Sequence, residues 1–459
     1  MSVHVSPPSP TSPEPPVAAA PSTAGAAADT VGTAATTAAT TAGAAATTAS
    51  SAVDARRWPD VARPPRASWL RTAIAERVVR HALARLALRV RLGEGETLGL
   101  GGPLMVVRDP HAFFRRIGAT GLIGFGESYM AGEWEADDVV GVLTVLAENA
   151  AVLVPAPLQR LRRVWALKRP DAQRNTPEGS RDNISHHYDL SNELFALFLD
   201  ETLSYSSALF RGFPADASLL PAAQHRKIDR LLDEARVGPG TRLLEIGTGW
   251  GELAIRAAAR GASVVTVTLS REQLDLAEKR IRAAGMEDRV TVRLCDYRRV
   301  GGTFDAVVSV EMIEAVGEEF WPEYFTTLDR LLAPGGRIAL QAITMPHDRL
   351  LASRTTHTWI GKYIFPGGLI PSVEVMEQLT AAHTSLRVVE RDGFGPHYAQ
   401  TLRLWRERFA EQEARVDALG FDATFRRMWT FYLAYSEAGF RSGYLDVQQM
   451  VLAREGTTR

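Results

Sequence analysis

The chain has 459 residues, and its 52 Lys and Arg nearly balance its 53 Asp and Glu. Because the net charge is only −1, we expect no bulk attraction to nucleic acid and no nucleic-acid partner. The single cysteine, Cys295, excludes intramolecular disulfides and Cys-rich metal sites, and it favours a reducing cytoplasm. The sequence has no apolar run long enough to span a bilayer, so it predicts a soluble protein.

The first part of the chain, residues 1–53, differs sharply in composition from the rest. It is dominated by Ala, Thr, Pro and Ser, and its first 50 residues contain no aromatic residue, Lys or Arg. Such a stretch buries too little apolar surface to offset the entropy of ordering it. We therefore predict a disordered tail.

The rest of the chain is predicted to have three parts. Residues 54–160 are expected to form a small N-terminal α/β domain, residues 161–224 a linker with gating helices, and residues 225–459 a larger α/β domain. In the last part, apolar strand-like runs (RLLEIG, SVVTVTL, VTVRLCD, FDAVVSV and RIALQAI) alternate with helical runs. This alternation is typical of a doubly wound, mainly parallel, Rossmann-like sheet.

Two basic amphipathic stretches occur at 68–91 and 157–169, where Arg residues alternate with apolar residues at helical spacing. Taken alone, each is explained by a solvated helix face. Together they also fit a surface that settles on anionic lipid head groups.

The strongest local motif is LLEIGTGWG at 243–251, a buried strand followed by glycines and a helix. Glycines allow a ligand to approach the backbone at the mouth of the sheet. An acid, Glu245, precedes the first glycine, and it would repel a pyrophosphate but attract the ammonium group of S-adenosylmethionine (SAM). The motif therefore favours a SAM-dependent methyltransferase over an NAD enzyme, with binding residues Glu245, Gly247, Thr248, Gly249 and Gly251.

The next two strand ends supply further candidates for the SAM site. The first carries Thr268, Leu269 and Ser270, with Gln273 one turn later in place of the acid that usually binds the ribose. The second carries Asp296 and Tyr297, where Asp296 would accept from the adenine amine.

Four segments together identify a family: 186–210, the glycine-rich segment beginning at 243, SVEMIEAVG at 309–317 and YIFPGGLIPS at 363–372. They resemble the cyclopropane-fatty-acyl-phospholipid synthases and mycolic acid methyltransferases over about residues 65 to 452. The resemblance implies SAM as methyl donor and a cis double bond of a membrane phospholipid acyl chain as acceptor. It also implies that Tyr205 and Ser206 line the SAM pocket.

The family holds a bound bicarbonate as its base, through a Glu, a Tyr, a backbone amide, a Cys and a His. These positions fall on Glu314, Tyr398, the amide of Ile343, Ser207 and Gln341, so the thiol and the imidazole are replaced. A further family cysteine falls on Ser436. Because serine and glutamine still form hydrogen bonds with an oxyanion, the anion site is expected to persist in altered form.

The sequence leaves two possible products, a methylene or methyl branch and a cyclopropane ring. YSSALF and LQAITMPHDR resemble the branch-forming methyltransferases, which work with a partner reductase, and cyclopropane formation is a close second. The enzyme is expected to be cytoplasmic and peripheral on the inner face of the membrane, with its oligomeric state open. The alternative is a lipid-binding protein with a degenerate methyltransferase domain, suggested by the missing Cys and His.

Two further interpretations concern segments outside these motifs. Residues 346–375, with Trp359, Tyr363, Ile364 and Phe365, are expected to line an acyl channel. Glu133, Asp137 and Asp138 are interpreted as a solvated turn. His186 and His187 are not expected to bind metal, and no metal site is predicted.

Overall fold

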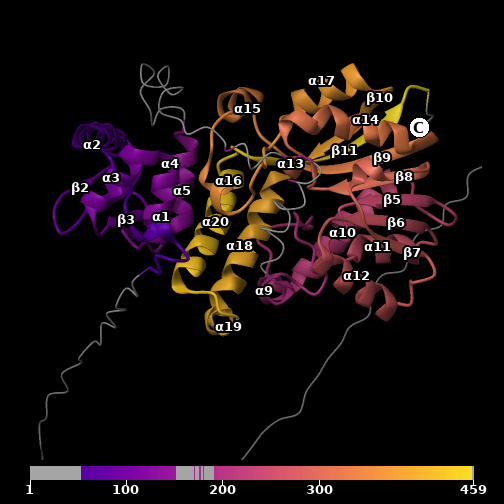
Figure 1. Cartoon of the computed structure of the whole chain (residues 1–459), viewed down its shortest axis with the longest axis horizontal. Helices are drawn as coiled ribbons and strands as arrows, with labels where there is room; N and C mark the ends of the chain where they lie inside the picture. Colours follow the sequence, from indigo (N-terminus) through magenta and orange to yellow (C-terminus); the bar gives the residue numbers. More distant parts are fainter. Residues whose placement is uncertain (1–52, 151–169, 171–174, 177–178, 180–190, 457–459) are drawn as a thin grey trace, which may run out of the picture. The chain divides into compact units, whose positions relative to one another are not determined.

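The computed structural model describes residues 53–150, 170, 175–176, 179 and 191–456, drawn as ribbon in Figure 1. Residues 1–52 of the predicted tail, the basic stretch 157–169 and the His186–His187 pair lie outside the described residues. Residues Ser50–Arg459 belong to one compact unit. The predicted start of the larger domain, residue 225, falls inside helix α10 (Leu220–Glu234).

A seven-stranded sheet forms the larger α/β part, in the order β10-β11-β9-β8-β5-β6-β7. All neighbouring pairs from β9 to β7 are parallel, and β11 runs antiparallel to both β9 and β10. The doubly wound, mainly parallel sheet predicted from the sequence is therefore confirmed. The strands are β5 (Arg242–Ile246), β6 (Ser263–Thr268), β7 (Val290–Leu294), β8 (Phe304–Val310), β9 (Leu332–Thr344), β10 (Leu386–Gly393) and β11 (Asp446–Arg454).

Helices cover both faces of this sheet, because successive residues of each strand point to opposite sides. Leu243 packs into one buried core with α10, α11 (Glu252–Ala259) and α12 (Arg271–Ala283). Its neighbour Leu244 packs into a second core, which contains residues of α14 (Trp321–Leu331) and α17 (Val373–His383). The predicted helices thus lie where the alternating pattern placed them (Figure 1).

The N-terminal region forms its own four-stranded sheet, in the order β2-β1-β3-β4. The basic stretch predicted at 68–91 forms helix α2, capped by the Ser68 side chain, and continues into strand β1. The elements are α1 (Pro59–Ala62), α2 (Trp69–Leu83), β1 (Arg89–Leu92), β2 (Thr97–Leu98), β3 (Leu104–Val107), α3 (Pro110–Thr120), α4 (Leu122–Met130), β4 (Trp134–Ala136) and α5 (Val139–Glu148).

Two long helices near the C-terminus, α18 (Gly395–Glu411) and α20 (Ala423–Arg441), lie between the N-terminal region and the seven-stranded sheet (Figure 1). Their aromatic and apolar side chains share one buried core with α4, α5 and α9 (Asn192–Phe198). The remaining helices are α13 (Ile313–Val316), α15 (His347–Ser353), α16 (Trp359–Tyr363) and α19 (Glu413–Ala418).

The interpretation of Glu133 as part of a solvated turn is wrong. Glu133 is only 9% exposed, and both of its carboxylate oxygens accept from Nε of the buried Arg116, at 2.8 and 3.0 Å. Desolvation raises the pKa of Glu133 to about 7 even though Arg116 opposes the shift. Asp138, by contrast, caps helix α5 from an exposed position, and Asp137 lies beside it.

No helix among the described residues is both long and apolar enough to cross a membrane.

Candidate active site

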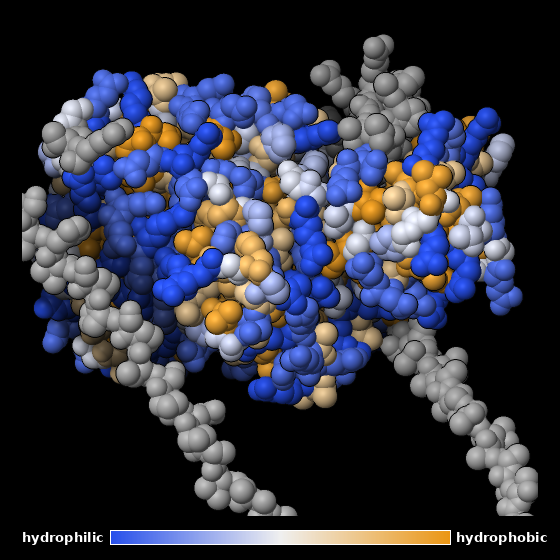
Figure 2. All heavy atoms as spheres, turned by 180° about the vertical axis from the view of Figure 1, so that it is seen from behind, coloured by the Kyte–Doolittle hydropathy of each residue, from blue (hydrophilic) through white to orange (hydrophobic). Residues whose placement is uncertain are grey.

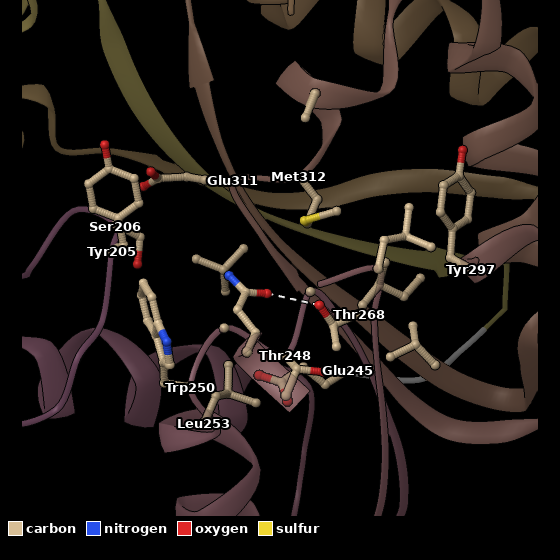
Figure 3. Close-up of a pocket in the computed structure, with 18 of the residues that line it drawn as sticks. Tyr205, Ser206, Glu245, Thr248, Trp250, Leu253, Thr268, Tyr297, Glu311 and Met312 are labelled. Carbon is tan, nitrogen blue, oxygen red and sulfur yellow. Dashed lines mark hydrogen bonds between the residues drawn. The ribbon is translucent and has the colours of Figure 1, made fainter. Parts of the chain in front are cut away.

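A pocket opens at the carboxyl ends of β5, β6, β7 and β8, the edge where parallel sheets bind ligands (Figure 3). It is lined by most of the residues predicted to bind SAM: Tyr205, Ser206, Glu245, Gly247, Thr248, Gly249, Thr268, Leu269, Gln273, Asp296 and Tyr297. Gly251 and Ser270 do not line it. They begin α11 and α12 instead, and the Ser270 hydroxyl accepts from the amide of Gln273 at 3.2 Å.

The glycine-rich turn requires glycine at two pocket positions. Gly247 has φ +98°, and a Cβ there would lie 2.7 Å from the sulfur of Met312. Gly249 has φ +51°, and a Cβ there would meet no atom within 4 Å. A side chain at Gly249 would therefore enter the pocket, while one at Gly247 would collide with its wall.

Glu245, the last residue but one of strand β5, lines the pocket and is only 3% exposed. Desolvation raises the pKa of its carboxyl to about 8, against the lowering effects of Thr266 and Lys227. One of its oxygens, Oε2, has no hydrogen-bond partner among the described residues. A buried carboxyl with an unused oxygen is well suited to bind a cationic ligand group.

Two further residues predicted to bind SAM, Gln273 and Asp296, also line the pocket. The Thr268 hydroxyl donates to Oε1 of Gln273 at 2.8 Å, shown as the dashed line in Figure 3, which orients the amide nitrogen of Gln273 away from this bond. Both carboxylate oxygens of Asp296 accept from Arg298, at 2.9 and 2.6 Å, so the Asp296 carboxylate is held by a cation. Tyr297 lies close by with its hydroxyl buried.

Lys227 is a pocket residue that the sequence analysis did not identify. Its ammonium donates to the Ser206 hydroxyl at 2.6 Å, and only 2% of the residue is exposed. Burial lowers the pKa of Lys227 to about 8, although Glu311, Asp200 and Glu245 favour its charged form. The pocket thus contains a cation as well as the Glu245 carboxyl.

Beside the residues predicted to bind SAM lies a pair of acids, Glu311 and Glu314, directly after strand β8. The other four residues predicted to hold an anion meet these two acids, Ser207 through its backbone amide and not through the predicted side chain. The Ser207 amide and the Gln341 side-chain amide donate to Oε1 of Glu311 at 2.9 and 2.8 Å. The Tyr398 hydroxyl donates to Oε2 of Glu311 at 2.6 Å, and the amide of Ile343 donates to Glu314.

The five residues predicted from the family are therefore brought together, and the residue they surround is one that the sequence analysis missed. Glu311 lines the pocket and reaches toward Tyr205 (Figure 3). Desolvation raises the pKa of Glu311, against the effect of its donors. Desolvation and the neighbouring Glu311 raise the pKa of Glu314 to about 8.

Aromatic rings surround this carboxylate pair. Tyr205 stacks on Trp405 with centroids 5.3 Å apart, and its hydroxyl lies 2.7 Å from that of Tyr432. Tyr398 packs on Phe440 at 4.5 Å. Aromatic faces stabilise positive charge, and a closely packed apolar surround excludes water. The site is therefore suited to a cationic intermediate.

The predicted channel residues pack against helices α4 and α20. Trp359 contacts Phe431 edge to face at 4.8 Å, and the Tyr363 hydroxyl donates to Glu127 at 2.8 Å. Ile364 is buried, and the ring of Phe365 lies 6.0 Å from that of Tyr432. Phe365 thus belongs to the aromatic wall around the carboxylates.

The fold, the glycine-rich turn and the pocket define a SAM-dependent methyltransferase. Residues 175–450 match the family model described as mycolic acid cyclopropane synthetase, and the chain belongs to this family. The resemblance inferred from the four sequence segments is thereby confirmed.

Relatives support the same assignment. The chain is 54% identical to tuberculostearic acid methyltransferase UfaA1 of Mycobacterium tuberculosis over 415 residues, covering 88% of this chain and 97% of that protein. It is 35% identical to cyclopropane-fatty-acyl-phospholipid synthase of Escherichia coli K12 over 350 residues, covering 76% and 87%.

Two solved structures share the fold at similar identity. The cyclopropane synthase MmaA2 of Mycobacterium tuberculosis superposes with a TM-score of 0.55 at 32% identity, over 60% of this chain and 98% of that one. Mycolic acid cyclopropane synthase CmaA1, complexed with SAH and CTAB, gives 0.54 at 31% identity, over 59% and 97%. The structure with SAH supports SAM as the cofactor of this fold.

Proposed function

We propose that the protein transfers the methyl group of SAM to the cis double bond of an unsaturated phospholipid acyl chain. The observation that carries the proposal is the carboxylate pair with its aromatic surround, next to a pocket with the features of a SAM site. An alkene is a weak nucleophile, and its methylation leaves a carbocation on the chain. Such a step needs aromatic faces, exclusion of water and a base, and all three are present.

Within the pocket, the charged groups match the two ends of the methionine part of SAM. The Glu245 carboxyl is suited to the ammonium group, and Lys227 to the carboxylate. Gln273 and Asp296 are assigned to the ribose and the adenine. The intact pocket argues against a degenerate methyltransferase that only binds lipid.

For the product, we propose a methylene branch, which a partner reductase converts to a methyl branch. The resemblance of YSSALF and LQAITMPHDR to branch-forming enzymes supports this choice, as does the relative named a tuberculostearic acid methyltransferase. Ring closure to a cyclopropane is the second candidate, supported by the relatives named cyclopropane synthases.

We also propose that the enzyme works as a peripheral protein on the inner face of the membrane. Helix α2 exposes Trp69 (80%), Leu70 (53%) and Ile74 (38%) beside the exposed cations Arg71 and Arg77. Figure 2 shows hydrophobic residues gathered among hydrophilic ones on the side of the molecule that holds the N-terminal region. Exposed apolar and basic side chains on one helix are typical of binding to an anionic lipid surface.

A bound bicarbonate does not fit the residues present. Of the predicted donors, Gln341 and Tyr398 already bond to Glu311, and the Ile343 amide bonds to Glu314. The Ser207 hydroxyl donates instead to the carbonyl of Ala208 at 3.1 Å. Among the described residues, the predicted donors are therefore all engaged and a further anion would face two acidic side chains, so we assign no step to bicarbonate.

The test is turnover on vesicles of dioleoyl phospholipid with SAM, followed by mass spectrometry of the fatty acid methyl esters. A gain of one carbon on the oleoyl chain is expected, and reduction with hydrogen over a catalyst separates a methylene branch from a ring. Unchanged oleoyl chains in the presence of bound SAM would overturn the proposal.

A further inference from the structure

The placement of Glu311 costs the protein free energy in two ways, through backbone strain and through desolvation of a carboxylate. Its φ of +52° lies in the left-handed region, which costs a non-glycine residue about 1 kcal/mol or more. Its carboxylate is also removed from bulk water, which raises its pKa. A glycine would adopt this φ without strain, so the side chain itself has a use here.

Three donors from distant parts of the chain fix the Glu311 carboxylate. They come from the segment before α10 (Ser207), from β9 (Gln341) and from α18 (Tyr398). Gln341 is fixed in turn by Gln449, whose amide donates to Gln341 Oε1 at 3.0 Å. The carboxylate is therefore oriented, and Oε2, which accepts from Tyr398 among the described residues, keeps a lone pair to accept a proton.

We propose that Glu311 is the catalytic base of this enzyme, a side-chain carboxylate where relatives of this family are expected to hold a bicarbonate. The inference rests on the proposed function. Gln341 and Tyr398, two of the residues that the family resemblance assigns to the anion, donate instead to the Glu311 carboxylate. The base is then a side chain of the protein itself.

The electron balance of the reaction is complete with Glu311 in this role. The π pair of the double bond forms the new C–C bond to the SAM methyl, and the methyl–sulfur pair stays on sulfur, which gives S-adenosylhomocysteine. The acyl chain then carries the positive charge. After a hydride shift, a C–H bond breaks, its pair forms the new C=C bond, and its proton moves to Oε2 of Glu311. For ring closure no hydride shift occurs: a C–H bond of the transferred methyl breaks, its pair forms a C–C bond to the cationic carbon, and its proton moves to Oε2 of Glu311.

Glu314 assists by remaining neutral beside this base. Two neighbouring buried carboxyl groups do not ionise together readily, and desolvation together with the nearby Glu311 raises the pKa of Glu314 to about 8. Glu311 then carries the negative charge that attracts the cation and receives its proton.

The first experiment replaces Glu311 by Gln, which keeps the shape but accepts no proton. We expect kcat to fall by about 100-fold or more, the range for loss of a general base. Binding of SAM, measured by calorimetry, should change little, which also shows that the variant is folded. The surface variant Glu287→Gln is the matched control. Full turnover in E311Q would overturn the assignment.

The second experiment uses Glu311→Gly, which removes the strain at φ +52° and opens a space bounded by the three donors. We expect this variant to be inactive in buffer depleted of bicarbonate and to regain turnover when bicarbonate or formate is added. E311Q should show no rescue because its amide fills the space.

Wild-type turnover should not depend on added bicarbonate. A wild-type enzyme that loses activity when bicarbonate is depleted, or a SAM-binding E311G that no small anion rescues, would overturn the proposal. A wild-type enzyme that converts no acyl chain at all would instead refute the proposed function, so the two failures are distinguishable.

Discussion

Lys362 on α16 donates to Oε1 of Glu127 on α4 at 2.6 Å, joining segments 235 residues apart in sequence. The Tyr363 hydroxyl donates to the same oxygen at 2.8 Å. Glu127 is only 1% exposed. The N-terminal region is thus tied to the segment that carries Phe365 and the aromatic wall of the site.

Replacing Lys362 by Met should destabilise the protein by about 1–3 kcal/mol, because the buried Glu127 carboxylate would lose the nearer of its two cations and keep only Arg116, at 3.9 Å. Urea unfolding of the purified protein measures the change. The exposed Lys279, for which no ion pair is found within the described part of the chain, provides the control variant Lys279→Met. Equal unfolding midpoints for the two variants would contradict this assignment of the pair.

The sheet and the SAM pocket were predictable because their signals are local. Strands such as RLLEIG and the turn after it have a clear apolar pattern and glycines where the backbone has positive φ. Most of the predicted binding residues therefore line one pocket.

Glu311 and Glu133 escaped prediction because burial depends on distant partners. In SVEMIEAVG the family pattern draws attention to Glu314, and nothing nearby shows that Ser207, Gln341 and Tyr398 converge on Glu311. Two acids three residues apart immediately after a strand were the available signal. Glu133 likewise depends on Arg116, from another element of the N-terminal region.

Gly249→Val should abolish SAM binding, beyond any effect of the backbone strain that valine brings at this positive φ. The new side chain would project into the pocket, where no protein atom now lies within 4 Å of the Cβ position. Gly302→Val provides the control, because Gly302 also has positive φ (+90°) and open surroundings but lies outside the pocket. Calorimetry with SAM decides, and normal SAM affinity in G249V would contradict the placement of the ligand.

Membrane binding through α2 should depend on both its apolar and its basic side chains. Trp69→Ser combined with Leu70→Ser should weaken sedimentation with anionic phospholipid vesicles, and added salt should weaken binding of the wild type by screening Arg71 and Arg77. Leu419→Ser, at another exposed leucine (40%), controls for general loss of apolar surface. If neither salt nor the α2 substitutions change vesicle binding, α2 is not the membrane-binding surface.

Glu314 should make folding stability depend on pH. Its folded pKa of about 8 lies above the ordinary value of a glutamate, so its contribution is complete at low pH. As pH rises from about 4.5 to 8, the unfolded chain loses this proton while the folded protein keeps it, and stability falls by up to about 1.4 kcal/mol per pH unit. Glu314→Gln should therefore lose less stability than the wild type between pH 5 and pH 8 in urea unfolding. Parallel curves of stability against pH for the two proteins would contradict the raised pKa.

In turnover, Glu314→Gln should be less impaired than E311Q, because its amide resembles the neutral carboxyl.

SAM binding should strengthen with pH because of Glu245. Without ligand, burial holds the pKa of this carboxyl at about 8, whereas the cationic ligand favours the ionised form. The free protein therefore has to release a proton on binding below pH 8. Affinity should rise by up to about tenfold per unit from pH 6 and level off near pH 8. Glu245→Gln should bind SAM more weakly and without this rise, which separates the effect from titration of SAM itself. Calorimetry in two buffers of different ionisation enthalpy measures the released proton directly. The Glu245 carboxyl should release its proton to solvent when a cation binds beside it. If no proton is released, the ammonium group of SAM binds elsewhere in the pocket.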